Sequence, residues 1–209
     1  MITLYGSGQS RSFRALWALE EAGLEYDYQQ IRLGRPGDNG ARSASYTQLN
    51  IQGKVPTLVN DDLIITESAA ILNYIATLVP DRELIPLDDI KLRAQYDQLC
   101  FLVLSELEQP LWTTAKHNFA LPKELRLSDI HKTTQWEFDR AVGALDSLIH
   151  DKEFSVNKHF TMVDILIAHT LSWANTNNFE VPENLQNYSD RMYQRPACQR
   201  ALKAQQIEK

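Results

Sequence analysis

Cysteine is scarce in this chain of 209 residues. Cys100 and Cys198 lie far apart in the sequence and form no C-x-x-C motif. A dithiol redox site and a cysteine-ligated zinc site are therefore not expected. The histidines do not supply a metal site instead, because His150, His159 and His169 lack the spacing of metal ligands. We expect no metal and a reduced, intracellular setting.

Long apolar runs and an excess of positive charge are also absent. No stretch approaches the roughly 20 apolar residues that cross a bilayer, and the first residues, MITLYGSG, lack the basic and apolar regions of a signal peptide. The chain has 21 Lys and Arg against 27 Asp and Glu, which gives a net charge of −6. Nucleic-acid binding needs a basic surface. We expect a soluble, cytoplasmic protein that binds neither membranes nor nucleic acid.

Apolar residues are plentiful. Hydrophobic residues make up 44% of the chain and charged residues 23%, which is an ordinary globular mixture. This share is sufficient for a core that needs no disulfide or metal to support it. The length permits one large domain or two small ones.

The first 80 residues alternate between strand and helix patterns. The predicted elements are, in order, a strand over 2–5, a helix over 10–22, a strand from 26, a loop with one short helix over 34–46, a hairpin over 55–66 and a helix from 67. Gly23 is expected to close the first helix in a left-handed conformation. Residues 1–80 therefore predict an α/β domain whose first two strands are parallel, because a helix connects them.

Strand patterns end after a proline-bounded linker over residues 81–87. Residues 88–209 predict an all-helical domain, with helices over 88–119, over 128–150, from 161 and within 183–205. Pro110 is expected to kink or end the first of these helices. Thr161 and Asp164 have the spacing of a capping box, which predicts a helix start there rather than a ligand site.

Five segments, taken together, resemble the cytosolic glutathione transferase family. They are LYGSGQSRSFRALWALEEAGL, LNIQGKVPTLV, ESAAILNYI, FTMVDILIAH and RPACQRAL, and they occur in the family's order at about its spacing across essentially the whole chain. The resemblance is to a bacterial-type member with a serine loop, and the subgroup stays unassigned. It implies a thioredoxin-like N-terminal domain, a helical C-terminal domain that contributes a second-substrate pocket, a homodimer, and glutathione as co-substrate in detoxification.

Glu67 and Ser68 are the candidate dock for the γ-glutamyl end of glutathione. They lie where a strand ends and a helix starts, so unpaired backbone N–H groups and the helix dipole favour an anion. The Ser68 N–H and hydroxyl would hold the glutamyl carboxylate and Glu67 the ammonium, as the family's Glu-Ser pair implies. The competing interpretation is an ordinary helix start.

Val55 and Pro56 are the candidate partners of the cysteinyl unit. The resemblance implies a cis peptide bond before Pro56, with the backbone of Val55 pairing with glutathione like an added strand. Lys54 would place a cation near the glycyl carboxylate, and Gln52 would add a hydrogen bond. Solvated loop residues are the alternative for Lys54 and Gln52.

Ser10 is the candidate for the residue that activates the thiol. Arg14 matches the arginine of the family's S-x-x-x-R pattern, which places Ser10 at the activating position. Its hydroxyl would donate to the glutathione sulfur and favour the thiolate, and the helix N-terminus would assist with the same sign of field. An N-cap serine is the structural alternative, and the two roles are compatible.

Other residues of the same loop remain open as donors. Ser7 and Ser12 lie close enough to take the role if the loop is shifted by one or two residues. Arg11 would contribute charge beside the thiolate, whereas Tyr5 belongs to the strand and is expected to pack. The loop contains no cysteine, and QSRS stands where maleylacetoacetate isomerases of the zeta type carry Ser-Ser-Cys-Ser, which argues against thiol-transfer and isomerase subgroups.

The segment SELEQPLW resembles a stretch in which one bacterial subgroup carries a His-Lys pair. Glu108 and Gln109 occupy those positions here. We expect Glu108 and Trp112 to line the second-substrate pocket, and the competing interpretation is that Glu108 is a solvated residue on a helix surface. Lys116 and His117 lie nearby in the sequence, but the sequence gives less support for placing them in this pocket.

Two functions of different kinds follow. The first is an enzyme that ionises glutathione and attacks a small electrophile, by conjugation or by reduction of an organic hydroperoxide. The alternative is a non-catalytic protein of the same fold that binds glutathione, apolar ligands or other proteins. A complete dock favours the enzyme.

Overall fold

The chain forms two compact units in the computed structural model, which describes residues 1–156 and 158–206. Of these residues, the first unit contains Met1–Ile85 together with 194–206, and the second contains those of Pro86–Tyr193. The division after Ile85 falls inside the expected linker. The return of the chain's end to the first unit is a feature that no sequence pattern indicated. Within these described residues, every helix is too short or too polar to cross a bilayer.

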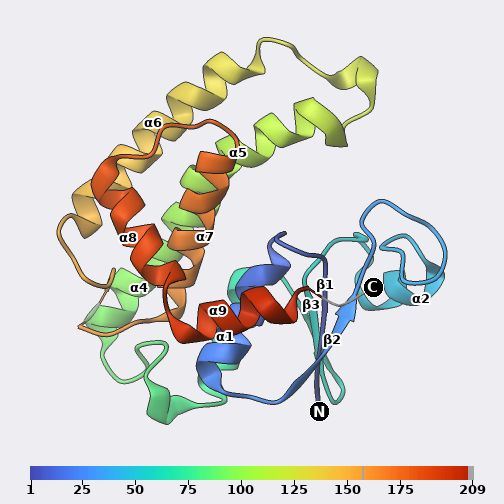
Figure 1. Ribbon diagram of the computed structural model, residues 1–209, viewed down its shortest axis with the longest axis horizontal. Coiled ribbons are helices and arrows are strands. Elements are labelled where there is room, and N and C mark those ends of the chain that lie inside the picture. Colours follow the sequence, from blue (N-terminus) through green and yellow to red (C-terminus); the bar gives the residue numbers. More distant parts are fainter. Residues whose placement is uncertain (157, 207–209) are drawn as a thin grey trace. The chain divides into compact units, whose positions relative to one another are not determined.

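A four-stranded mixed sheet forms the centre of the first unit (Figure 1). Its strands are β1 (Ile2–Gly6), β2 (Tyr26–Gln30), β3 (Thr57–Asn60) and β4 (Leu63–Thr66), in the spatial order β2-β1-β3-β4. β1 and β2 are parallel, as predicted, and the other pairs are antiparallel. This is the thioredoxin-like α/β arrangement expected from the sequence.

Helix α1 (Ser12–Ala22) is the main packing element of this unit. Ten of its eleven residues are buried, because α1 lies against α3 (Ser68–Thr77) and α9 (Pro196–Ala204). Figure 1 shows α1 and α9 side by side. Gly23 closes α1 with φ 64° and donates its N–H to the Leu19 carbonyl, which confirms the predicted cap.

An ion pair joins α9 to α1. Arg195 donates to both carboxylate oxygens of Glu21, at 2.6 and 2.9 Å, and the Trp17 indole donates to the same carboxylate at 3.0 Å. The Glu21 side chain is only 7% exposed. A bidentate contact of this kind holds α9 in one orientation on α1.

The segment between β2 and β3 contains α2 (Ala44–Leu49). A short helix was expected within 34–46, and it begins two residues before the end of that range. Ser43 fixes its start by accepting the Tyr46 N–H at 3.1 Å. After α3, a 3₁₀ turn over Pro80–Arg82 leads out of the unit.

The second unit begins with one continuous helical stretch. α4 (Ile90–Leu102), a π turn (Val103–Leu107), α5 (Glu108–Ala115) and a second π turn (Lys116–Ala120) follow one another directly. Pro110 therefore does not end the helix. The Glu108 N–H bonds to the Val103 carbonyl, and this wider π turn accommodates the proline that follows, which has no N–H and crowds the preceding turn.

The remaining helices of this unit are α6 (Ile130–Ile149), α7 (Met162–Thr176) and α8 (Glu183–Tyr193), with a 3₁₀ turn over Lys123–Leu125. The capping box at the start of α7 is confirmed, since Asp164 accepts the Thr161 N–H at 2.7 Å. The single helix expected within 183–205 is wrong. Two helices, α8 and α9, occupy this range, because Pro196 starts a new helix at its first position.

Gly6 at the end of β1 allows the backbone to pass close to its neighbours. A methyl group on Gly6 would lie 2.7 Å from the Tyr28 ring and 2.8 Å from Cβ of Ser12. We expect Gly6→Ala to lower the free energy of unfolding by about 1–3 kcal/mol through overpacking, measured by urea unfolding. Gly143→Ala on α6 is the matched control, because nothing lies within 4 Å of the added carbon and alanine favours a helix. Equal stability of Gly6→Ala and wild type would contradict the close packing.

The backbone is strained at Glu67, between β4 and α3. This residue has φ 67° and ψ 114°, a region that side chains with a Cβ disfavour. Glu67→Gly is expected to be more stable than Glu67→Ala by about 1–2 kcal/mol, measured by thermal and urea unfolding. At Glu137, exposed in α6, the same pair of substitutions should show the reverse order. The same order at both positions would argue against strain at Glu67.

Candidate active site

Strand register brings three separate segments to one edge of the sheet. Tyr5 at the end of β1 pairs with Thr57 at the start of β3, and Thr57 in turn pairs with Thr66 at the end of β4. The chain leaving β1, the chain entering β3 and the chain leaving β4 therefore meet at this edge. These are the segments that carry Ser10, Val55–Pro56 and Glu67–Ser68.

The loop after β1 is organised by serine side chains. The Ser10 and Ser12 hydroxyl oxygens are 2.9 Å apart, and Ser10 Oγ also accepts the Ser12 N–H at 3.3 Å. The Ser7 N–H donates to Ser12 Oγ at 3.1 Å. The Ser10 carbonyl accepts the Phe13 N–H at 2.9 Å, so Ser10 lies at the entrance of α1.

Burial separates the three candidate serines. Ser12 is fully buried, whereas Ser7 and Ser10 are half-buried. A ligand in solvent therefore has access to Ser7 and Ser10 but not to Ser12. Because Ser12 binds the Ser7 backbone and the Ser10 hydroxyl, its position holds the loop together from inside.

Helix α3 presents its N-terminus at the same edge. Its first-turn N–H groups have no acceptor within the helix, and the helix dipole adds partial positive charge. Ser68 is only 5% exposed and accepts a hydrogen bond from the Arg14 guanidinium at 3.3 Å. Arg14 is completely buried on α1. The Glu67 side chain is exposed beside this helix end.

The peptide bond between Val55 and Pro56 is cis, as the family resemblance implies. Two hydrogen bonds fix the backbone just before this peptide bond. The Lys54 carbonyl accepts one from the Tyr46 hydroxyl at 2.5 Å and one from the Asn50 side-chain amide at 2.9 Å. The Lys54 side chain is exposed.

Gln52 is also exposed, and its N–H bonds to the Asn50 side chain at 3.0 Å. Sequence reasoning missed Tyr46 and Asn50 as supports of this loop, because no local pattern links them to Lys54.

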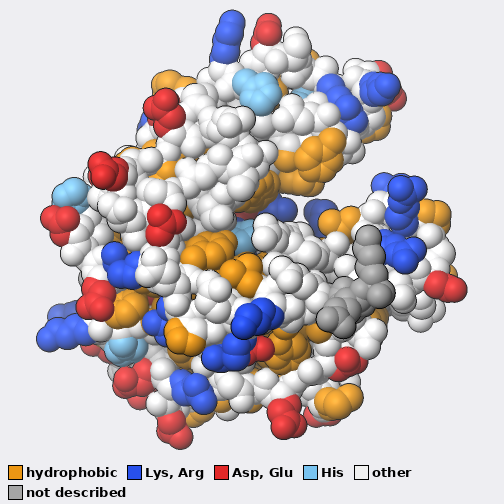
Figure 2. Space-filling model, viewed as in Figure 1, with side chains coloured by type: hydrophobic (Ala, Val, Ile, Leu, Met, Phe, Trp, Pro, Cys, Tyr) orange, Lys and Arg blue, Asp and Glu red, His pale blue; other side chains and the backbone are white. Residues whose placement is uncertain are grey.

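Positive side chains flank this edge although the chain is acidic overall. The segment that enters α2 carries Arg32, Arg35 and Arg42, all exposed. Figure 2 shows Lys and Arg side chains gathered beside α2. Such a local field favours an anionic ligand.

Glu108 and Trp112 belong to the second unit, whereas the other predicted site residues belong to the first. Glu108 is 4% exposed, so the interpretation of a solvated glutamate is wrong. A carboxylate on the apolar side of α5 is unusual, because most glutamates stay in water. Trp112, one helical turn further on, is half-buried. Lys116 and His117 follow in the second π turn, where His117 accepts the Leu127 N–H at 3.0 Å.

The chain's own thiols have no features of nucleophiles. Cys100 and Cys198 are both buried, and burial raises the pKa of each thiol to about 12. Both therefore stay protonated at neutral pH. Any reactive thiolate at this site must come from a ligand.

No three metal-ligating side chains come together within 1–156 and 158–206. His150 is exposed and lies 3.2 Å from Asp146 and 3.4 Å from Asp151. Its hydrogen bond to Asp146 raises the pKa of the imidazole. His169 is buried on α7.

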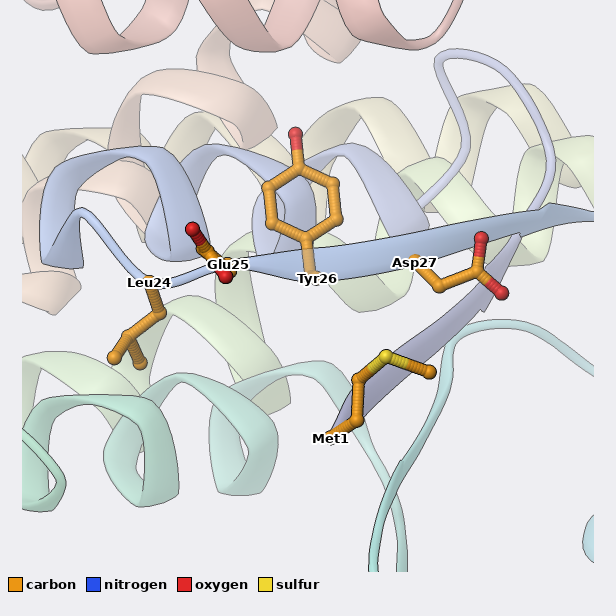
Figure 3. Close-up of a pocket in the computed structure, with 5 residues that line it drawn as sticks. All are labelled: Met1, Leu24, Glu25, Tyr26 and Asp27. Carbon is orange, nitrogen blue, oxygen red and sulfur yellow. The ribbon is translucent and has the colours of Figure 1, made fainter.

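A separate hollow lies at the beginning of the two parallel strands (Figure 3). It has a volume of about 480 Å³ and is lined by Met1, Leu24, Glu25, Tyr26 and Asp27. These residues precede or begin β1 and β2, so they lie at the end opposite to the serine loop. Its two carboxylates would repel an anion, which separates it from the candidate site.

Known proteins share this architecture and sequence pattern. The glutathione S-transferase N-terminal domain matches residues 1–77. GstA of Escherichia coli O157:H7, a glutathione S-transferase, is 27% identical over 195 residues, covering 91% of this chain and 92% of the relative. A probable maleylacetoacetate isomerase of Caenorhabditis elegans is 29% identical, covering 82% of this chain and 78% of the relative.

Solved structures extend the similarity to both units. The beta class glutathione S-transferase of Sphingomonas chungbukensis has a TM-score of 0.82 at 28% identity, with 98% of each chain covered. A sphingomonad glutathione S-transferase in complex with glutathione shares the fold, with a TM-score of 0.84 at 24% identity, covering 98% of this chain and 99% of that chain. The matched domain over residues 1–77, the relatives along most of the chain and the shared fold together show that this protein is similar to the glutathione S-transferases.

Proposed function

We propose that this protein is a glutathione transferase, which ionises the glutathione thiol and directs it at a small electrophile by conjugation or by reduction of an organic hydroperoxide. The convergence of the serine loop, the cis-proline segment and the α3 N-terminus at one sheet edge is the observation that carries this proposal. These three segments match the three parts of glutathione that need recognition: sulfur, peptide backbone and γ-glutamyl end.

The γ-glutamyl end binds at α3 in this proposal. Its carboxylate accepts the first-turn N–H groups and the Ser68 hydroxyl, and its ammonium pairs with Glu67. The exposed position of Glu67 and the helix dipole support this orientation. The strained backbone of Glu67 also supports a binding role, since such strain persists where function needs it.

The cysteinyl and glycyl units bind along the loop before β3. The Val55 backbone pairs with the cysteinyl unit as an added strand, and Pro56 fixes the direction of the chain there. Lys54 and Gln52 face the glycyl carboxylate. The two hydrogen bonds on the Lys54 carbonyl support a rigid loop, which reduces the entropy lost on binding.

Ser10 activates the sulfur. Its oxygen accepts the Ser12 N–H and lies 2.9 Å from the Ser12 hydroxyl, so its own hydrogen can point to the ligand. A chain of hydrogen bonds from the Ser7 N–H to the Ser12 hydroxyl and from there to the Ser10 hydroxyl would make Ser10 a stronger hydrogen-bond donor to the sulfur. Lowering a thiol pKa from about 8.5 by ~2 units corresponds to about 2.7 kcal/mol and makes most of the thiol ionised at neutral pH.

The electrophile occupies a pocket to which Glu108 and Trp112 contribute. Trp112 supplies an apolar wall, and the buried Glu108 supplies a polar group in place of the bases found in one bacterial subgroup. Orientation of the electrophile against the thiolate then provides the remaining acceleration. A detoxifying role in a reducing cytoplasm, where thiols stay unpaired, agrees with the two unpaired buried cysteines.

Ser10→Ala is expected to lower kcat/KM for chlorodinitrobenzene and glutathione by about tenfold or more, because the thiolate loses its donor. The ultraviolet absorbance of the bound thiolate, followed against pH, should show a higher thiol pKa in the variant. Ser45→Ala on α2 is the control, since Ser45 is exposed and outside the loop. If Ser7→Ala gives the loss instead, Ser7 is the donor, and retention of glutathione without turnover by the wild type would favour a binding protein.

We also propose a homodimer. Large apolar side chains are exposed on α4, where Phe101 is 69% exposed and Ile90 is 88% exposed. Leu63 and Ile64 are exposed on the edge strand β4. Apolar surface of this kind favours association.

Sedimentation is expected to give twice the chain mass of 24.0 kDa. Phe101→Asp should shift the equilibrium toward the monomer, because it places a charge in the apolar contact. Leu127→Asp, at a residue that is 62% exposed after α5, is the control for a charge at another exposed apolar position. A wild-type monomer at micromolar concentration would contradict the dimer.

A further inference from the structure

A buried hydroxyl without a partner lies beneath the serine loop. Tyr28 is half-buried in β2, and its hydroxyl oxygen is buried with no hydrogen-bond partner among residues 1–156 and 158–206. Such an oxygen has lost its contacts with water and has gained no replacement, which costs free energy. Phenylalanine would fill the same space without that cost, so packing alone does not explain a tyrosine at this position.

Strand pairing places this hydroxyl near the start of α1. Tyr26 and Tyr28 pair with Ile2 and Leu4 of β1, and residues two apart on a strand point to the same face of the sheet. The Tyr26 hydroxyl donates to Glu20 of α1 at 2.6 Å, so this face is the one that α1 covers. Tyr28 lies further along the strand on the same face, where α1 begins.

The Tyr28 hydroxyl lies against the base of the loop that carries Ser10. A methyl group on Gly6 would lie 2.8 Å from this oxygen and 2.8 Å from Cβ of Ser12, so Tyr28 and Ser12 crowd the same side of Gly6. Burial raises the pKa of the Tyr28 hydroxyl, and the backbone of Gly8 acts in the opposite direction. A backbone group favours a phenolate only through its N–H, so the Gly8 N–H faces the oxygen.

Gly8 belongs to the turn that sets the position of Ser10. The Ser10 N–H bonds to the Ser7 carbonyl at 3.2 Å and closes a turn over residues 7–10, in which Gly8 has φ 47°. A Cβ on Gly8 would meet nothing within 4 Å, so packing does not lock the turn on that side. A small movement of the Gly8 peptide toward β2 would complete a hydrogen bond to Tyr28 Oη.

We infer that Tyr28 is a positioning residue of the serine loop: its hydroxyl accepts the Gly8 N–H when the loop closes on the ligand, and this bond fixes the turn that directs Ser10 at the sulfur. The inference rests on the proposed function and deepens it, because it names a residue outside the loop that controls thiol activation. The unpartnered hydroxyl raises the free energy of the open loop relative to the closed loop. A ligand that favours the closed loop therefore binds more tightly.

Tyr28→Phe removes only this oxygen. With glutathione present, kcat/KM for chlorodinitrobenzene should fall about fivefold, as expected for one lost hydrogen bond, and ultraviolet titration should show a higher pKa for the bound thiol. Without ligand, the urea midpoint should equal or exceed that of the wild type, because the group that is lost has no partner. Tyr26→Phe is the matched control on the same strand and face. It loses the bond to Glu20, so it should lower the urea midpoint and leave the thiol pKa unchanged.

A double-mutant cycle with Ser10→Ala tests whether Tyr28 acts through the loop. In the Ser10→Ala background, Tyr28→Phe should lower kcat/KM by less than about twofold. Ser7→Ala takes the place of Ser10→Ala in the cycle if it is the variant that loses activity. A lower urea midpoint for ligand-free Tyr28→Phe would show that the hydroxyl already has a partner, such as a buried water, and would overturn the inference. An unchanged thiol pKa or full additivity in the cycle would overturn it as well.

The proposed function and this inference fail differently. If the wild type does not bind glutathione, the proposed function fails and takes the inference with it. If the wild type binds and turns over glutathione but Tyr28→Phe keeps the wild-type thiol pKa, the inference alone fails.

Discussion

The pairing of Tyr5 with Thr57 and of Thr57 with Thr66 is the constraint on which the site depends. Backbone hydrogen bonds along β1, β3 and β4 fix where each strand ends. Strand register therefore brings the serine loop, the cis-proline segment and the α3 N-terminus to the same edge of the sheet. A shift of one residue in either pairing would turn the following side chains to the other face of the sheet.

Burial then divides the tasks among similar residues. Ser12 and Arg14 are buried on α1 and contact the Ser10 and Ser68 hydroxyls, whereas Ser10 is half-buried. In the proposed site the half-buried Ser10 gives the contact, and the buried Ser12 holds the Ser10 hydroxyl in place. Because Ser12 and Arg14 both lie on α1, packing of this helix against α3 and α9 controls two parts of the site at once.

Local signals allowed the sequence to predict much of this. The order of strands and helices over residues 1–80, the Gly23 cap and the Thr161 capping box each depend on residues a few positions apart. The helix that continues through Pro110 depends on a π turn that has no sequence signature. The burial of Glu108 and the hydrogen bond from the Tyr46 hydroxyl to the Lys54 carbonyl depend on tertiary packing. The periodicity of apolar residues in the sequence does not predict such contacts.

The packing of α9 on α1, which includes the Glu21–Arg195 pair, makes the first unit discontinuous along the chain. Residues 1–85 are synthesised first, but α1 lacks one of its packing neighbours until Pro196–Ala204 has left the ribosome. Domains generally fold as units during synthesis. For this chain, the thioredoxin-like unit can only be completed after the helical unit has been synthesised, so the last helix completes the first unit.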